Sequence, residues 1–389
     1  MSDLNKLADE PDVEPKTDKA ASRRRFLKGG AVAAAAAGAT LAFPQVSRAQ
    51  TVTLKMQGAW GAKDIFNDMA VEYVDRVNAM SGGRLKIDYL VAGAVVKPFQ
   101  VQDAVHKGVL DAAHSVPVYW YGKSKVASLF GTGPVFGQDA PLGLAWIYRG
   151  GGQELYDELL ANLKINVVGF FAMPMPTQPL GWFKREIKSA DDLVGLKYRT
   201  VGLAADLFQE MGLKVTQLPG GEIVPALERG VIEAFEFNNP TSDRSFGAQD
   251  VSKIYMMGSY HQAAEFFEII INKDRFNELS DEQKAILRYS AEAANSSNFF
   301  TAMDRYSADL QWLRNEAGVK VIRTPQSIMD KQLEAWDILI KRLEEEDPFF
   351  AKVLKSQKEF AHRAAYFKLL NDCDYKLAFE HYFPGELGF

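Results

Sequence analysis

Five alternating segments near the start of the chain constrain its fold more than any other feature. Strand-like runs occur at Thr51–Met56, Leu85–Val91 and Leu110–Val116. Between them, Ile65–Val77 and Val101–Lys107 carry apolar residues at helical spacing. Strands that alternate with helices at this spacing form crossover units, because parallel strands need a connection of that length. The sequence therefore predicts an α/β fold with a mostly parallel sheet.

The chain is predicted to enter a second lobe after the strand-like run Val167–Phe171. Two prolines, Pro174 and Pro176, stiffen the segment that follows. Further helix–strand units lie between Gln178 and Gln262, and the apolar run Phe266–Asn272 is expected to carry the chain back. The expected domains are residues 50–176 (lobe 1, completed by about residues 265–325), residues 177–262 (lobe 2) and residues 326–389 (C-terminal helices that pack on the lobes).

The N-terminal segment has the pattern of an export signal. Ser22–Lys28 contains paired arginines followed by Phe, Leu and Lys, and an Ala-rich apolar run extends from Ala31 to Phe43. Ser47-Arg48-Ala49 places small residues where a signal peptidase reads them. The run is too short for a good transmembrane helix, and a buried Ala-rich helix is the alternative. Residues 1–49 are thus predicted to be a twin-arginine signal peptide that directs the protein to the periplasm.

Composition and motif searches exclude several classes of function. The formal net charge of −5 argues against nucleic acid as the main partner. Cys373 is the single cysteine, so no internal disulfide can form. The sequence contains no HExxH, Walker or Gly-x-Ser-x-Gly motif, and no nucleophile–base constellation is visible. We therefore predict a protein that is not an enzyme.

Two charged residues stand where strand-like runs end in the second lobe. Arg199 ends the run Leu196–Tyr198 just before Gly202, and Glu236 ends the run that begins at Val231. Ligand groups gather at strand ends in open α/β sheets, and Arg matches a carboxylate in a planar, bidentate manner. The alternative is that this Arg and Glu are solvated or paired with each other.

Three segments around these residues resemble one family of transport proteins. They read GWFKREI (Gly181–Ile187), DDLVGLKYRTVG (Asp191–Gly202) and GGEIVPALERGVIEAFEF (Gly220–Phe237). Together they resemble the solute receptors of tripartite ATP-independent periplasmic (TRAP) transporters, within them the α-keto acid-binding branch, and the resemblance extends from about Thr53 to the C-terminal helices. It implies a two-lobed periplasmic-binding-protein fold that closes like a flytrap on a small organic acid, a 2-oxo or 2-hydroxy carboxylate. It also implies delivery of that acid to TRAP membrane permease subunits.

The resemblance also implies a set of site residues. Arg199 falls on the family's carboxylate-binding Arg, and Gln178 on the Gln of a Q-x-x-G-W-F pattern. Glu236 and the backbone carbonyl of Phe237 fall on ligands of a Na⁺ or Ca²⁺ ion that bridges protein and substrate, although Phe237 replaces the usual Trp. A further acidic metal ligand of the family aligns with the neutral Gln262, and Glu265 substitutes for it if the register shifts. No enzymatic cofactor is implied.

Three more residues are candidates for contact with the ligand. Trp60 lies in a Gly-bearing turn, and Tyr121 belongs to the aromatic run Val118–Lys123, which is either a stacking wall or core packing. Asn239 is a candidate for recognition of a hydroxyl or carbonyl group, and turn chemistry before Pro240 is the alternative.

The C-terminal helices raise the question of a partner subunit. Helices are predicted over Gln326–Glu346 and Pro348–Tyr382. Apolar residues of the first fall on one stripe: Leu333, Trp336, Leu339, Ile340 and Leu343. This stripe packs either on the protein's own core or on a second copy, and the resemblance implies that a homodimer would use these helices. Two rival functions remain open from sequence: a binding protein for an ATP-driven transporter or sensor kinase, and an enzyme that processes an organic acid.

Overall fold

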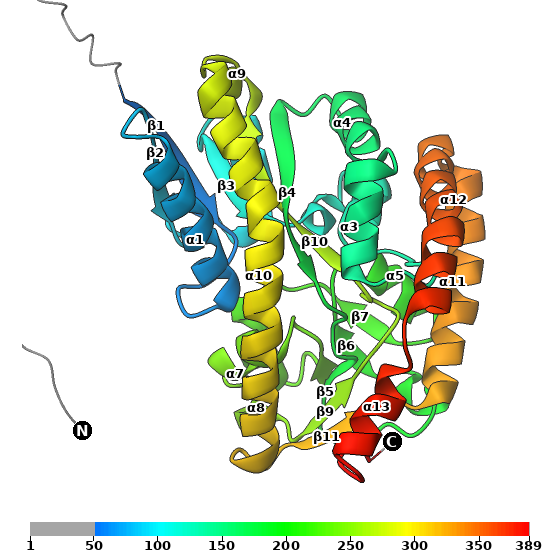
Figure 1. The fold of residues 1–389 in the computed structure, drawn as a ribbon. Helices are drawn as coiled ribbons and strands as arrows, with labels where there is room; N and C mark the ends of the chain where they lie inside the picture. Colours follow the sequence, from blue (N-terminus) through cyan, green and yellow to red (C-terminus); the bar gives the residue numbers. More distant parts are fainter. Residues whose placement is uncertain (1–50, 389) are drawn as a thin grey trace, which may run out of the picture. The chain divides into compact units, whose positions relative to one another are not determined.

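The computed structural model describes residues 51–388, so the predicted signal peptide, residues 1–49, lies outside the described residues. Within residues 51–388, no helix is both long enough and apolar enough to cross a membrane. The described strands form two separate sheets, one of five strands and one of six (Figure 1).

The first sheet has the strand order β2-β1-β3-β10-β4. Its strands are β1 (Val52–Gly58), β2 (Leu85–Leu90), β3 (Ala112–Ser115), β4 (Val167–Met175) and β10 (Glu265–Asn272). The strand β1 pairs in parallel with β2 and β3, as the alternating segments predict, whereas β10 runs antiparallel to both β3 and β4. The sheet is mixed because β10 enters it on the return from the second lobe.

The second sheet has the order β11-β9-β5-β8-β6-β7. Its strands are β5 (Gly181–Phe183), β6 (Lys197–Arg199), β7 (Lys214–Thr216), β8 (Ala234–Phe235), β9 (Ile254–Met257) and β11 (Lys320–Arg323). The strand β11 pairs with β9 here, although the boundary predicted from sequence assigned residues up to about 325 to the first lobe. The other domain boundaries stay a prediction.

Helices cover both sheets. They are α1 (Ile65–Met80), α2 (Val101–His106), α3 (Ala140–Arg149), α4 (Gly152–Asn162), α5 (Leu203–Glu210), α6 (Ile223–Glu228), α7 (Pro240–Ser245), α8 (Ala248–Val251), α9 (Lys273–Asn277), α10 (Asp281–Asn315), α11 (Gln326–Glu346), α12 (Pro348–Asn371) and α13 (Tyr375–Tyr382). Short 3₁₀ helices η1 (Pro98–Gln100), η2 (Pro117–Trp120), η3 (Lys125–Phe130), η4 (Ala190–Leu193) and η5 (Gly220–Glu222) lie in the connections.

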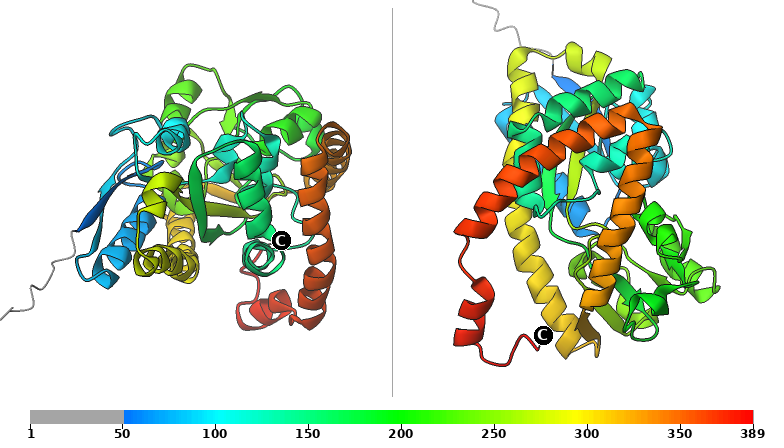
Figure 2. Two further views of the ribbon diagram at one scale, coloured as in Figure 1. Left: turned by 90° about the horizontal axis from the view of Figure 1, so that it is seen from above. Right: turned by 90° about the vertical axis from the view of Figure 1, so that its right-hand side faces the viewer.

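Two helical elements connect the lobes. The long helix α10 packs on β4 and α1 of the first lobe and on α7 of the second (Figure 1). It starts at a capping box in which Ser280 and Gln283 satisfy each other's backbone N–H groups. The helices α11 and α12 form an antiparallel hairpin along one side of the molecule (Figure 2), with α11 against α5 and α12 against α3. These elements therefore hold the two sheets in one body.

The structure corrects the predicted C-terminal helices at two points. The helix predicted over Pro348–Tyr382 is broken after Asn371, and Asp374 caps a new helix by accepting a hydrogen bond from the backbone N–H of Leu377. In α11, Trp336, Leu339, Ile340 and Leu343 are buried, but Leu333 is 46% exposed because it lies on the outer edge of the stripe.

Candidate ligand-binding site

Arg199 and Glu236 form a buried ion pair at the ends of two adjacent strands. The parallel strands β6 and β8 place Arg199 opposite Phe235, so Glu236 follows directly beside the guanidinium. Nη1 of Arg199 donates to Oε1 of Glu236 over 3.0 Å and to the Glu236 carbonyl over 2.8 Å. Both residues are 1% exposed. The two residues are thus paired with each other, as one of the sequence alternatives states, but they are not solvated.

The hydrogen bonds of Arg199 leave one side of its guanidinium available. Nε donates to the carbonyl of Leu218 over 2.8 Å, and both N–H groups of Nη1 are used by Glu236. Among the described residues, Nη2 has no partner. The backbone therefore fixes the orientation of the guanidinium and leaves two N–H donors for an anion.

A second buried carboxylate, Glu265, lies near this pair at the start of β10. Gln178 donates from Nε2 to Glu265 over 3.1 Å, and the backbone N–H of Gln178 donates to the carbonyl of Gln262 over 3.0 Å. Burial and, to a smaller extent, the charge of Glu236 raise the pKa of Glu265 to about 8. Burial likewise raises the pKa of Glu236 to about 7, against the lowering effect of Arg199. Two carboxylates thus share the field of one guanidinium.

Several polar atoms in this region have no partner within residues 51–388. They are Oε2 of Glu236, Oε1 of Gln178, and both Oε1 and Nε2 of Gln262, and all are buried. A buried polar atom without a partner costs free energy, so such a group of atoms indicates a place for a ligand, an ion or water. Within the described residues, no three His, Cys, Asp or Glu side chains are arranged to hold a metal ion. Any cation here would depend on amide and carbonyl oxygens besides one or two carboxylates.

The structure places the other predicted residues in local contacts. Nε1 of Trp60 donates to Nδ1 of His114 over 2.9 Å, and its ring packs among aromatic residues of the first lobe. The side chain of Asn239 caps α7: Oδ1 accepts from the backbone N–H of Ser242, and Nδ2 donates to Oγ of Ser242. The hydroxyl of Tyr121 donates to Asp206 over 2.6 Å. The ring of Phe237 is half-buried, with its centroid 5.7 Å from the Arg199 guanidinium.

Sequence reasoning missed two polar residues near the site, Asp64 and Tyr306. Asp64 is the N-cap of α1, and its Oδ1 accepts from Oγ of Ser242 in the second lobe over 3.0 Å. Burial raises the pKa of Asp64 to about 7. The buried hydroxyl of Tyr306 has no partner among the described residues. Burial raises the pKa of this hydroxyl, and the charges of Asp64 and Glu265 act in the same direction. An acidic residue directly before the first helical pattern is a capping signal that could have identified Asp64, whereas nothing local marks Tyr306.

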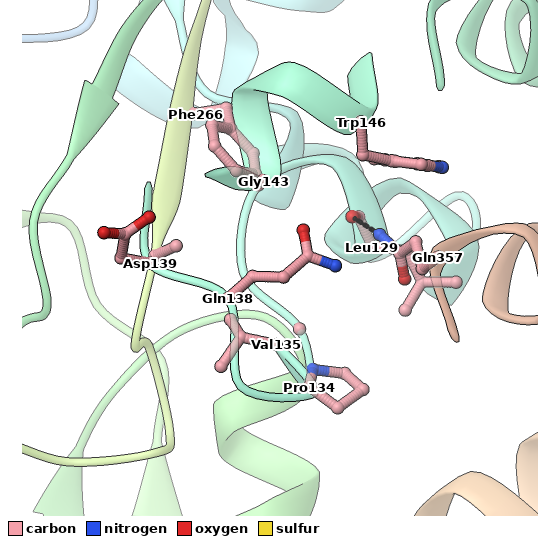
Figure 3. Close-up of a pocket in the computed structure, with 12 residues that line it drawn as sticks. Leu129, Pro134, Val135, Gln138, Asp139, Gly143, Trp146, Phe266 and Gln357 are labelled. Carbon is pink, nitrogen blue, oxygen red and sulfur yellow. Dashed lines mark hydrogen bonds between the residues drawn. The ribbon is translucent and has the colours of Figure 1, made fainter. Parts of the chain in front are cut away.

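A small cavity, lined in part by the two sequence neighbours of Glu265 (Ala264 and Phe266), is not large enough for an organic acid. It has a volume of about 30 Å³ and is lined by residues that include Gln138, Trp146, Phe266 and Gln357 (Figure 3). Nε2 of Gln357 donates to the Leu129 carbonyl over 2.7 Å at one side of it. A cavity of this size has room for about one water molecule and not for an organic acid.

The fold and the buried charged site define a two-lobed α/β binding protein. Comparison with known proteins gives the same class. The sequence pattern of bacterial extracellular solute-binding proteins, family 7 (DctP), matches residues 56–347. A monocarboxylate 2-oxoacid-binding periplasmic protein of Nostoc sp. is 32% identical over 308 residues, which are 77% of this chain and 82% of that protein.

Two solved structures are similar over nearly the whole described chain. One is a TRAP transporter solute-binding protein from Bordetella bronchiseptica, a mixed-occupancy dimer with copurified calcium and picolinate. It superposes with a TM-score of 0.79 at 27% sequence identity, and the match covers 87% of this chain and 98% of that protein. A TRAP periplasmic solute-binding protein from Pseudoalteromonas atlantica, with bound sodium and pyruvate, gives 0.78 at 28% identity over 86% of this chain and 100% of its own. The chain belongs to the DctP family of TRAP solute-binding proteins. This confirms the family and the two-lobed fold that the sequence predicts, and the relatives are solute-binding proteins of the periplasm.

Proposed function

We propose that this receptor binds a small 2-oxo or 2-hydroxy carboxylate between its lobes, with the carboxylate on Arg199. The observation that carries the proposal is the guanidinium fixed by three hydrogen bonds, with Nη2 unpaired among the described residues. The relatives support this chemistry, because one is a 2-oxoacid-binding protein and the neighbouring structures hold pyruvate or picolinate. Gln178 lies within reach of the same region, while Trp60, Tyr121 and Asn239 would shape the cleft rather than bind through their polar atoms.

We further propose that Na⁺ or Ca²⁺ binds beside the acid. The residues fit a hard cation, because Oε2 of Glu236 and Oε1 of both Gln178 and Gln262 are buried and unpaired within residues 51–388. The Phe237 carbonyl would complete this set, and Glu265 is the alternative to Gln262. When bound, the cation supplies positive charge to the ligand oxygens and to the excess of buried carboxylates. Calcium and sodium in the neighbouring structures support this assignment.

The remaining parts of the role follow from the family. We propose that the protein reaches the periplasm by the twin-arginine route, delivers its acid to TRAP permease subunits and catalyses no reaction. Ligand contacts to both lobes would favour the closed state, since a ligand shifts a population by its difference in affinity for the two states.

A thermal-shift screen of organic acids, followed by calorimetry, tests the proposed ligand. Pyruvate, longer 2-oxo acids, 2-hydroxy acids and aromatic acids are compared in buffers with Na⁺, with Ca²⁺ and with chelator in a Na⁺-free buffer. We expect a 2-oxo acid to raise the melting temperature by mass action, and the rise to shrink when the cations are removed. The absence of any shift with every acid and ion would contradict the proposal, and an equal shift without cations would contradict its metal part.

We also propose that the C-terminal helices form a homodimer. Nine large apolar side chains between residues 366 and 383 are exposed, which is more than a monomer usually leaves on one short segment: Tyr366, Phe367, Leu369, Leu370, Tyr375, Leu377, Phe379, Tyr382 and Phe383. The segment continues beyond the α11–α12 hairpin at one end of the molecule (Figure 2). The Bordetella bronchiseptica relative is a dimer, which supports a second copy of the chain as the partner that covers these side chains.

Light scattering after size exclusion tests the dimer. We expect the wild type to have the mass of two chains, and Leu369→Asp with Leu370→Asp to have the mass of one, because a charged residue cannot be buried in an apolar interface without a partner. The control is Ile338→Asp, which places a charge on an exposed apolar position of α11, outside the segment 366–383, and should leave the mass unchanged. A wild-type mass of one chain would refute the dimer.

A further inference from the structure

Asp206 connects the two lobes at a point away from the proposed ligand contacts. It lies on α5, which packs against β7 of the second sheet and against α11. Oδ2 accepts a hydrogen bond from the hydroxyl of Tyr121 over 2.6 Å, and Oδ1 accepts from Nζ of Lys125 over 2.8 Å. Tyr121 follows η2 and Lys125 begins η3, and these two segments pack on β10, α4 and α12 of the first lobe. Both donors therefore reach Asp206 across the boundary between the lobes.

The contact is well shielded from solvent on the acceptor side. The Asp206 side chain is 10% exposed, whereas that of Lys125 is 37% exposed. Burial and the hydrogen bond to Asp206 raise the pKa of Tyr121, so its hydroxyl keeps the proton that it donates. Each carboxylate oxygen of Asp206 is occupied by one donor, which makes a direct role in ligand binding unnecessary to explain its burial.

The backbone next to Asp206 also approaches the first lobe closely. Gly202, the residue before α5, has a φ of 62°, and a Cβ atom built on it would lie 1.9 Å from Cγ2 of Val118. Val118 belongs to η2, the segment that leads to Tyr121. A polar contact and a tight apolar contact thus join the same two segments, η2 and the start of α5, and both need the lobes to be together.

We propose that Asp206 is a latch that holds the lobes closed and thereby sets the rate at which the ligand leaves. This inference rests on the proposed function, because it assigns Asp206 a positioning role in the same binding site. Opening must break two hydrogen bonds to a charged, shielded acceptor, so the latch slows opening and with it the release of the ligand. It also gives Tyr121 a role as a lobe-to-lobe donor.

The test compares dissociation and association rates for pyruvate in the presence of Ca²⁺, followed by tryptophan fluorescence. We expect Asp206→Asn to release pyruvate about tenfold faster than wild type and to bind it no more slowly, as the loss of one or two charge-assisted hydrogen bonds that hold the lobes closed would produce. Tyr121→Phe removes one donor only and should give a smaller increase in the same direction. It also provides a second variant if Asp206→Asn folds poorly.

Glu210→Gln on the same helix is the matched control. Glu210 pairs with Arg342 of α11 over 3.1 Å, and this partly exposed pair joins α5 to the hairpin instead of to η2 and η3. An equal increase in release for Glu210→Gln and Asp206→Asn, or no increase in either latch variant, would overturn the proposal.

Small-angle scattering of the ligand-free proteins separates the latch from the choice of ligand. We expect Asp206→Asn to have a larger radius of gyration than the wild type, because the open state becomes more populated. This measurement does not involve pyruvate. If wild-type protein fails to bind pyruvate, the proposed ligand is wrong but the latch is still tested; equal radii would overturn the latch.

Discussion

Arg199→Ala is expected to weaken binding of the organic acid by roughly 2–5 kcal/mol, the range for truncating one partner of a buried charge pair. The unpaired Nη2 of Arg199 lies in a buried region that contains few other positive groups, so nothing replaces it as a partner for the carboxylate. Arg199→Lys should recover only part of the loss, since an ammonium group cannot reproduce the three hydrogen bonds that orient the guanidinium. Calorimetric titration with the acid identified by the screen measures both values.

The same substitution is expected to lower stability, and the two effects must be separated. Without Arg199, the buried Glu236 carboxylate loses its partner, at a cost of about 3–5 kcal/mol when a buried pair is broken on one side. The pKa of Glu236, already raised to about 7 by burial, should then rise further. A carboxyl whose pKa is raised in the folded state stabilises the fold while it is protonated, and this contribution is lost as the pH rises through the folded-state pKa. The variant should therefore be less stable at pH 8 than at pH 6.

A double variant distinguishes binding from folding. Arg199→Leu with Glu236→Leu removes both buried charges and should recover most of the melting temperature, because apolar replacement of a complete buried pair is often neutral. It should not recover binding. Arg185→Ala is the control: Arg185 is an exposed arginine paired with Asp192 in the same lobe, and its loss should change neither quantity. Retained affinity in the double variant would show that Arg199 does not bind the acid.

The charged pair could be predicted from sequence because its position is a local property. Arg199 and Glu236 each end a strand, and adjacent parallel strands bring such ends together with no further information. The three glycines at positions 150–152 are a local signal of the same kind for a helix break, and Gly151 adopts a left-handed φ of 87° between α3 and α4. The period of apolar residues likewise placed α1 and α11.

Short elements could not be predicted in this way, and neither could contacts between segments that lie far apart in the sequence. The strands β5 and β9 have three and four residues, too few for an alternating pattern to be recognised. The helix α7 begins at Pro240, where turn chemistry and a helix start have the same sequence signal: Asn followed by Pro. The partner of Tyr121 is 85 residues away at Asp206, so only the docking of the two lobes shows that its hydroxyl is occupied.

Gly202→Ala is expected to prevent full closure and to reduce affinity for the acid at least tenfold. The added Cβ would come within 1.9 Å of Cγ2 of Val118 and 3.3 Å of Oγ of Ser128, both in the first lobe. The backbone at Gly202 has φ 62° and ψ −148°, a conformation that costs a residue with a side chain about 1–3 kcal/mol. Because the clash exists only while the lobes are together, the open state avoids it and becomes more populated.

A partner substitution separates the clash from the backbone strain. Val118→Ala removes the methyl group that the new Cβ would meet, so the double variant Gly202→Ala with Val118→Ala should regain part of the lost affinity, while the strain at residue 202 persists. Gly61→Ala is the control in a turn of the first lobe, where a Cβ would meet nothing within 4 Å, and it should leave affinity unchanged. Calorimetry gives the affinities, and scattering of the ligand-bound proteins gives the degree of closure. Wild-type affinity and compactness in Gly202→Ala would mean that residues 118 and 202 do not meet in the closed receptor, because a contact of 1.9 Å cannot be relieved by small side-chain movements.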